Sequence, residues 1–201
     1  MAIVTISAKD VSELRARTGA GMMDCKRALE EAGSDMDKAA EILRKKGIAK
    51  AEKRAGRTAS QGVVVSYIHH NSQVGVLLEL NSETDFVARN EAFQQLARDI
   101  ALHIASADPI AVRPEDIPAD LVERERRIAE EQVAAEGKPE AVRGKIVDGK
   151  VKKFIAERTL LEQPYVRDDK KTVGDLVKEV SGKLGEAITV RRFARFQVGA
   201  A

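Results

Sequence analysis

The chain of 201 residues carries 34 basic and 32 acidic side chains, a formal net charge of +2, and 43% hydrophobic residues. This near-neutral balance excludes the overall attraction to phosphate expected of a dedicated nucleic-acid or membrane-surface binder. A single cysteine, Cys25, excludes an intrachain disulfide framework, and with no membrane span or signal peptide in the sequence we expect a cytoplasmic protein that binds no membrane.

Residues 1–55 predict three short helices. Ser7 caps the first helix, and Gly19-Ala20-Gly21 ends it. Gly33 stops the second helix, and Gly47 is interpreted as the C-cap of the third. The apolar residues follow a spacing of i, i+3, i+4 and i+7, and in the second helix they are Cys25, Ala28, Leu29 and Ala32. We therefore expect a compact, Ala-rich three-helix module in which burial of Cys25 is favoured over reactivity.

Residues 56–62 are interpreted as a linker, because the helical pattern fades there. Four cations lie in or before this segment, namely Lys50, Lys53, Arg54 and Arg57. Two interpretations remain open for them. A solvated connector is favoured because no aromatic residues are interleaved with the cations, and a nucleic-acid contact is the alternative.

Residues 63–201 predict the core. Alternating residues from Val63 to Ile68 and from Val74 to Leu80 indicate an antiparallel hairpin, with His69-His70 in a solvated turn. From Phe93 the spacing becomes helical until about Pro109. His103 lies at the margin of this apolar stripe, and we expect it to be partly buried without a catalytic role.

A helical hairpin is predicted at about 118–158, split by Gly137-Lys138-Pro139, and Thr172 caps a last helix. The run at about 187–198 indicates a third strand, with one face formed by Ile188, Val190, Ala194, Phe196 and Val198. The predicted fold class is therefore α+β: three N-terminal helices, then a three-stranded antiparallel sheet backed by helices and a helical hairpin.

Catalytic and cofactor motifs are missing from the sequence. Gly19-Ala20-Gly21 does not continue into the Lys-Ser/Thr end of a phosphate-binding loop. The acidic residues around one loop, Glu83, Asp85 and Glu91, have no accompanying base, nucleophile or metal-ligand set. We therefore expect neither an enzyme nor a bound cofactor or metal.

Two features exceed what folding requires. Met22 and Met23 are adjacent at the start of a helix, where packing needs only one of them, so we expect the other to be partly exposed for an adaptable protein contact. Phe86 follows Thr84-Asp85 in a polar loop and precedes Val87. Either it anchors the loop in the core or it is presented to a partner.

These features lie in two segments that carry a resemblance. Residues 14–29, LRARTGAGMMDCKRAL, and residues 83–90, ETDFVARN, closely resemble two signatures of bacterial translation elongation factor Ts. Further similarity at residues 101–105, 151–154, 171–174 and 195–199 extends the resemblance over nearly the whole chain.

The resemblance implies a guanine-nucleotide exchange factor for elongation factor Tu, which promotes release of GDP so that GTP can rebind. It implies that the three-helix module is similar to a ubiquitin-associated domain and docks on the GTPase through Leu14, Met22 and Met23. It also implies that Thr84-Asp85-Phe86-Val87 disturbs the partner's magnesium and phosphate site. No cofactor and no nucleic acid is required for this activity.

The chain holds a single core unit, as in short members of the family that act as dimers. A three-stranded sheet covered by one layer of helices leaves a face that a symmetric partner can cover, so we expect a homodimer. A nucleic-acid module built on residues 50–57 with Arg191, Arg192 and Arg195 is the rival hypothesis. An enzyme that turns over GTP alone is a third.

Overall fold

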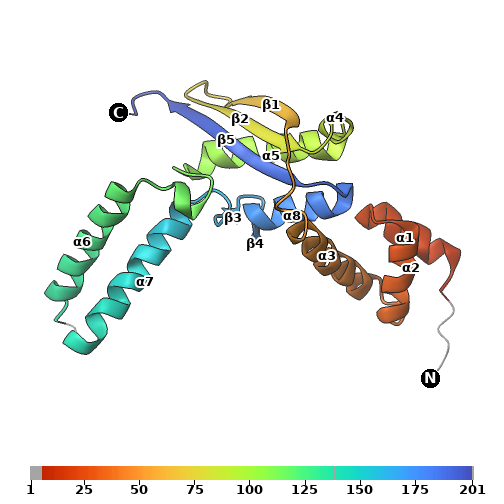
Figure 1. Cartoon of the computed structure of the whole chain (residues 1–201), viewed down its shortest axis with the longest axis horizontal. Coiled ribbons are helices and arrows are strands. Elements are labelled where there is room, and N and C mark those ends of the chain that lie inside the picture. The colour runs from red at the N-terminus through yellow and green to blue at the C-terminus, as the bar shows by residue number, and fades with distance from the viewer. Residues whose placement is uncertain (1–5, 138, 201) are drawn as a thin grey trace. The chain divides into compact units, whose positions relative to one another are not determined.

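The computed structural model describes residues 6–137 and 139–200 and confirms the α+β class (Figure 1). Residues 1–5, Ala201 and Lys138, which belongs to the predicted break in the hairpin, lie outside this part of the chain. Two compact units are formed. Unit 1 comprises the chain up to Val63, Asn81–Leu96 and Val177–Thr189, and unit 2 comprises Val64–Leu80, Ala97–Leu176 and the chain from Val190 on.

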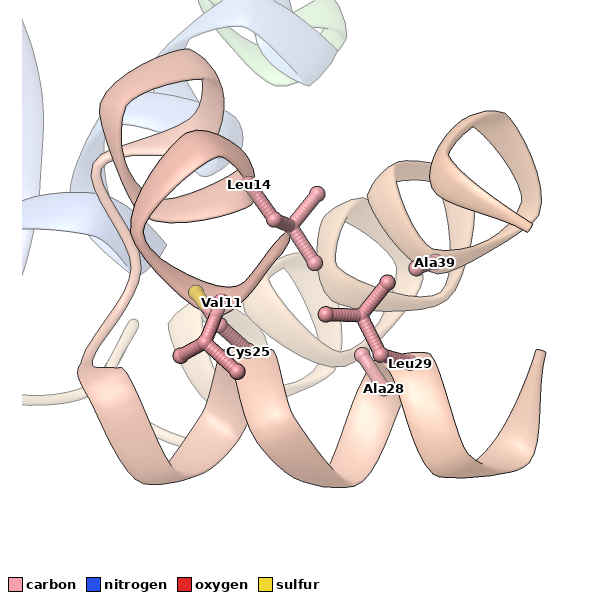
Figure 2. Close-up of a cluster of buried hydrophobic side chains, with 6 residues drawn as sticks. All are labelled: Val11, Leu14, Cys25, Ala28, Leu29 and Ala39. Carbon is pink, nitrogen blue, oxygen red and sulfur yellow. The ribbon is translucent and has the colours of Figure 1, made fainter. Parts of the chain in front are cut away.

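The three N-terminal helices are α1 (Ala8–Thr18), α2 (Met22–Glu31) and α3 (Met36–Glu52). The Ser7 hydroxyl caps α1 by accepting a hydrogen bond from the backbone N–H of Asp10 at 3.1 Å. The side chains that face inward form one buried cluster, which confirms the burial of Cys25 and consists of Val11, Leu14, Cys25, Ala28, Leu29 and Ala39 (Figure 2). Small side chains on α2 and α3 allow the helices to pack closely.

The sequence suggested that Gly47 ends the third helix, and this prediction is wrong. Helix α3 continues to Glu52, and Gly47 lies at its crossing with α8 (Val173–Leu184). A Cβ atom placed on Gly182 of α8 would lie only 2.6 Å from the carbonyl oxygen of Gly47. Ion pairs Arg44–Glu179 (3.3 Å) and Lys178–Glu52 (2.9 Å) flank this contact. The two glycines therefore allow the two backbones to touch.

The main sheet contains β1 (Gln61–Ile68), β2 (Val74–Ser82) and β5 (Ile188–Gln197) in the order β1-β2-β5. Helix α5 (Glu91–Ala107) runs along this sheet (Figure 1). In β2 the buried residues Val76, Leu78 and Leu80 alternate with more accessible ones, as predicted for a strand that is covered on one face.

Strand β5 departs from the expected alternation. Ile188 and Val190 are buried, but Phe196, predicted on the same face, is 68% exposed. The phase changes at Arg191 and Arg192, two consecutive residues that are both exposed. Beyond them the Arg195 guanidinium is turned toward α5, where it donates to the carbonyl oxygen of Ala105 at 3.2 Å. Phe196 consequently lies on the uncovered face.

The helical hairpin consists of α6 (Ala119–Ala135) and α7 (Glu140–Arg158), preceded by the short 3-10 helix η1 (Pro114–Asp116). Its seam is formed by buried small side chains, Ala129, Val133, Val147 and Val151. The structure adds a small antiparallel pair that the sequence did not predict, β3 (Pro164–Tyr165) and β4 (Asp168–Thr172). Strand β4, DDKKT, is too polar to show a strand pattern.

His103 is completely buried rather than partly buried at the edge of α5. The N–H of Val166 donates to its Nδ1 at 3.3 Å, and Nε2 lies 2.9 Å from the side-chain oxygen of Gln163. With Nδ1 as the acceptor, the single proton of the neutral ring is on Nε2. Burial lowers the pKa of His103 below its usual value. The histidine therefore has a structural place in unit 2.

Candidate partner-binding site

The segment after β2 forms a short, exposed tip. Ser82 ends the strand, and its hydroxyl donates to the carbonyl oxygen of Thr84 at 2.9 Å. Thr84 is the N-cap of α4 (Asp85–Ala88), with its hydroxyl oxygen accepting from the N–H of Val87 at 3.4 Å. A single helical turn of this length is not stable alone. Its geometry must therefore come from contacts with the rest of unit 1.

Two carboxylates supply these contacts. Glu186, which follows the end of α8, accepts hydrogen bonds from both the N–H (3.0 Å) and the hydroxyl (2.6 Å) of Thr84. Glu83 accepts from the N–H of Ala187 at 2.7 Å and pairs with Arg57 at 3.4 Å. Hydrogen bonds to charged groups are stronger than neutral ones. These reciprocal bonds fasten the tip to the segment between α8 and β5.

Phe86 lies at the end of this tip with 80% of its surface exposed. This exposure excludes the core-anchor interpretation of the ring. Val87 is half buried, and Ala88 is buried. Asp85 pairs with Arg89 at 2.8 Å, one turn further along the chain. The tip is therefore a fixed turn that holds an unburied aromatic ring in solvent.

Met22 and Met23 form a second exposed apolar place in unit 1. They are 54% and 61% exposed, so both methionines, and not one, are free of the module's core. Both lie in the first turn of α2, which begins after Gly21 without a side-chain cap. Flexible thioether side chains adapt to the shape of a binding partner.

Leu14 is placed differently from the two methionines. Its side chain is fully buried in the three-helix cluster (Figure 2) and presents no surface. Leu14 therefore lacks the exposure that a direct contact with a partner would need, whereas Met22 and Met23 have it. In this structure its contribution is to hold α1 against α2.

The acidic residues near the tip are occupied by ion pairs within unit 1. Glu83 and Asp85 are engaged with Arg57 and Arg89. Within residues 6–137 and 139–200 there is no group of three or more His, Cys, Asp or Glu side chains arranged to hold a metal ion.

Most of the basic residues of the nucleic-acid hypothesis are also engaged in ion pairs. Lys50 pairs with Asp24 at 3.2 Å, and hydrogen bonds from Arg27 and then Lys50 lower the pKa of that carboxyl. Arg192 pairs with Glu79 at 2.7 Å, and Arg195 with Asp108 at 2.9 Å. A phosphate would therefore have to compete with these carboxylates for the same cations.

Glu186 is not among the residues that the sequence predicted for this site. The residue follows Gly185 in a turn about one hundred positions from the tip, and neither periodicity nor a motif marks it. Only the fold brings its carboxylate to Thr84.

None of the helices in the described part of the chain is long and apolar enough to cross a membrane. The sequence profile of one family, Elongation factor TS, matches residues 3–200.

Similar proteins named Elongation factor Ts occur in several bacteria. The protein from Desulforamulus reducens is 55% identical over 96% of this chain and 89% of its own length. Those from Solidesulfovibrio magneticus and Thermosipho melanesiensis are 53% and 54% identical over 96% of this chain and 97% and 99% of their own lengths. With a match of this extent, the chain belongs to the elongation factor Ts family of translation elongation factors.

Proposed function

We propose that this protein is a guanine-nucleotide exchange factor for elongation factor Tu, acting in the cytoplasm. The observation that carries the proposal is Phe86, a large apolar ring held in solvent by a turn with anchored ends. Exposing such a ring has no benefit for folding, and fixing its position limits the entropy that would be lost on binding.

The proposed chemistry is differential binding, and no bond is made or broken by this chain. A factor that binds best to the nucleotide-free GTPase must, by linkage, weaken the GTPase's affinity for GDP by the same coupling free energy. Inserting Thr84-Asp85-Phe86-Val87 beside the magnesium and phosphate site would favour that nucleotide-free form. The factor is then a binding protein and not an enzyme.

The magnitude expected from Phe86 is moderate. Burial of one Phe side chain contributes about 1.5 to 3 kcal/mol. A tenfold change in nucleotide affinity corresponds to about 1.4 kcal/mol. Burial of Phe86 therefore accounts for a loss of about one to two powers of ten in the GTPase's affinity for GDP. Any further loss of affinity must come from the docking surfaces.

Met22 and Met23 are the proposed docking surface on the GTPase domain. Their exposure and the buried support from Leu14 suit a contact that adapts to its partner. Docking through Met22 and Met23 strengthens the complex with the GTPase whether or not nucleotide is bound, whereas the tip favours the nucleotide-free GTPase. The two sites should consequently affect different kinetic parameters.

The test is stopped-flow release of fluorescent GDP from elongation factor Tu, with this protein varied in concentration. Phe86→Ala should lower the limiting release rate at least tenfold while the melting temperature stays unchanged. Val142→Ala, an apolar truncation at another exposed position, is the matched control and should behave as wild type. The proposal fails if wild type does not accelerate release, if release requires RNA, or if this chain alone turns over GTP.

The proposal includes a homodimer formed through the uncovered face of the main sheet. Four exposed apolar side chains of unit 2 occupy this outer face, namely Val64, Ile68, Leu77 and Phe196. Gly75 leaves room for Ile68, whose Cδ1 would lie 3.1 Å from a Cβ on that glycine. The Glu79–Arg192 ion pair lies on the same face. A self-complementary apolar face is typical of a symmetric interface.

A further inference from the structure

A cleft in unit 1 lies between the three-helix module and α8, and Phe86, Met22 and Met23 are not among its lining residues. Its volume is about 560 Å³, which is within the range of small-molecule sites. Ala40 and Leu43 of α3 and Val180 of α8 give it an apolar wall. The Gly47–Gly182 contact holds these two helices together beside it.

The lining of the cleft carries an excess of positive charge. It includes five basic residues, Arg17, Arg44, Lys50, Arg54 and Lys183, and two acidic ones, Asp24 and Glu179. Three of the cations have carboxylate partners: Arg17 with Asp37, Arg44 with Glu179 and Lys50 with Asp24. The positive charge that remains belongs to Arg54 and Lys183.

Arg54 and Lys183 are the two cations in the lining of the cleft for which the described part of the chain gives no carboxylate partner. Nη1 of Arg54 is buried and has no hydrogen-bond partner among the described residues. The Lys183 side chain lies over Gly19, where a Cβ would overlap its Cε, so the absence of a side chain at Gly19 makes room for it. A buried N–H donor without an acceptor is unfavourable, and a turn of the guanidinium into the cleft would let an oxygen of an anionic ligand accept from it.

The chemistry of these groups favours phosphate. A guanidinium presents a fork of donors, an ammonium adds a point charge, and together they suit the several oxygens of a phosphate group. The cleft is larger than an inorganic ion requires. Its lining contains no aromatic residue, so a base would contact aliphatic side chains without stacking. We propose that this cleft binds a phosphate-bearing small molecule of nucleotide size, with Arg54 and Lys183 holding the phosphate.

The test uses calorimetric titration of the full chain with pyrophosphate, GDP, AMP and citrate as separate probes. Pyrophosphate and at least one of the two nucleotides should bind at a single site with a Kd below about 1 mM. Amide NMR shifts of Gly47 and Gly182 should move on binding, because both glycines line the cleft. Arg54→Gln/Lys183→Gln should weaken binding at least tenfold.

The matched control is Lys53→Gln/Lys152→Gln, which removes the same charge at two exposed positions that do not line the cleft. It should leave the Kd within twofold. Three results would overturn the proposal: no saturable binding, equal weakening in both double variants, or citrate binding as tightly as pyrophosphate. The last result would indicate a site for acidic side chains of a macromolecule. None of these measurements depends on nucleotide exchange.

Discussion

Glu186 receives two hydrogen bonds from Thr84, one from the backbone N–H at 3.0 Å and one from the hydroxyl at 2.6 Å. Both carboxylate oxygens are used, and the N-cap of α4 is thereby held in place. The consequence is that the orientation of Phe86 depends on a residue that lies outside the proposed contact segment Thr84-Asp85-Phe86-Val87.

Replacement of Glu186 by alanine should therefore impair exchange without changing Phe86. Hydrogen bonds to a charged group contribute about 1.5 to 3 kcal/mol, so we expect the limiting rate of GDP release to fall about tenfold or more. The tip should also become mobile, which amide hydrogen exchange at Val87 and Ala88 would measure. Glu186→Gln retains one acceptor oxygen and should recover part of the rate. Wild-type release by the alanine variant would contradict the positioning role.

Alanine substitutions at Gly47 and Gly182 should have opposite effects on stability, although the two glycines touch each other. Gly182→Ala places a Cβ 2.6 Å from the Gly47 carbonyl oxygen, whereas Gly47→Ala meets its nearest atom, the Gly182 Cα, at 3.9 Å. Overpacking costs about 1 to 3 kcal/mol, and alanine in a helix interior gains about 1 kcal/mol over glycine. Gly182→Ala should thus lower the melting temperature, and Gly47→Ala should leave it unchanged or raise it. Equal effects in calorimetry would show that the helices do not cross here.

Protonation of His103 should destabilise the protein in mild acid. Burial lowers its pKa in the folded state, and Val166 donates to Nδ1, which cannot accept once protonated. Below about pH 6.5, the usual pKa of histidine, the unfolded chain therefore binds more protons than the folded chain. The stability that the neutral His103 contributes is complete above that pH and is lost as the pH falls toward the pKa of the folded state. The maximal slope for one proton is about 1.4 kcal/mol per pH unit.

The measurement for His103 is urea unfolding at several pH values between 7 and 5. His103→Gln should flatten this part of the stability profile, whatever its stability at pH 7. His70→Asn, in the exposed hairpin turn, is the control and should retain the wild-type slope. The assignment fails if the two variants give the same profile.

The proposed dimer can be tested on its apolar face. Ile68→Ser/Phe196→Ser removes two exposed side chains, each worth about 1.5 to 3 kcal/mol when buried. The dimer should weaken at least a hundredfold, and light scattering at micromolar concentration should show single chains. Val166→Ser changes an exposed apolar residue elsewhere in unit 2 and should remain dimeric. A single-chain mass for the wild type would refute the dimer.

The local signals in the sequence predicted the helices and strands of this protein well. Apolar spacing placed α1 and α2, and the lack of a periodic partner singled out Phe86, which is exposed. The buried cysteine followed from its position on the α2 stripe. These features depend on neighbours within one or two turns of the chain, which a sequence displays directly.

The errors arose where distant segments meet. Gly47 looked like a helix end because its actual partner, Gly182, lies in another helix far along the chain. The burial pattern of β5 changes phase at Arg191 and Arg192, so strict alternation put Phe196 on the wrong face. Glu186 gave no sign of its bond with Thr84. Such contacts are set by tertiary packing and leave no periodic trace.

The glycine contact between α3 and α8 also matters for anyone who shortens this protein. Removing the first 55 residues would uncover the surface of α8 around Gly182 and would remove the Arg44 side chain that pairs with Glu179. We expect the truncated protein to aggregate and to be cleaved readily by proteases. Its inactivity in an exchange assay would therefore say little about docking. Point substitutions on the intact chain are the sounder way to dissect it.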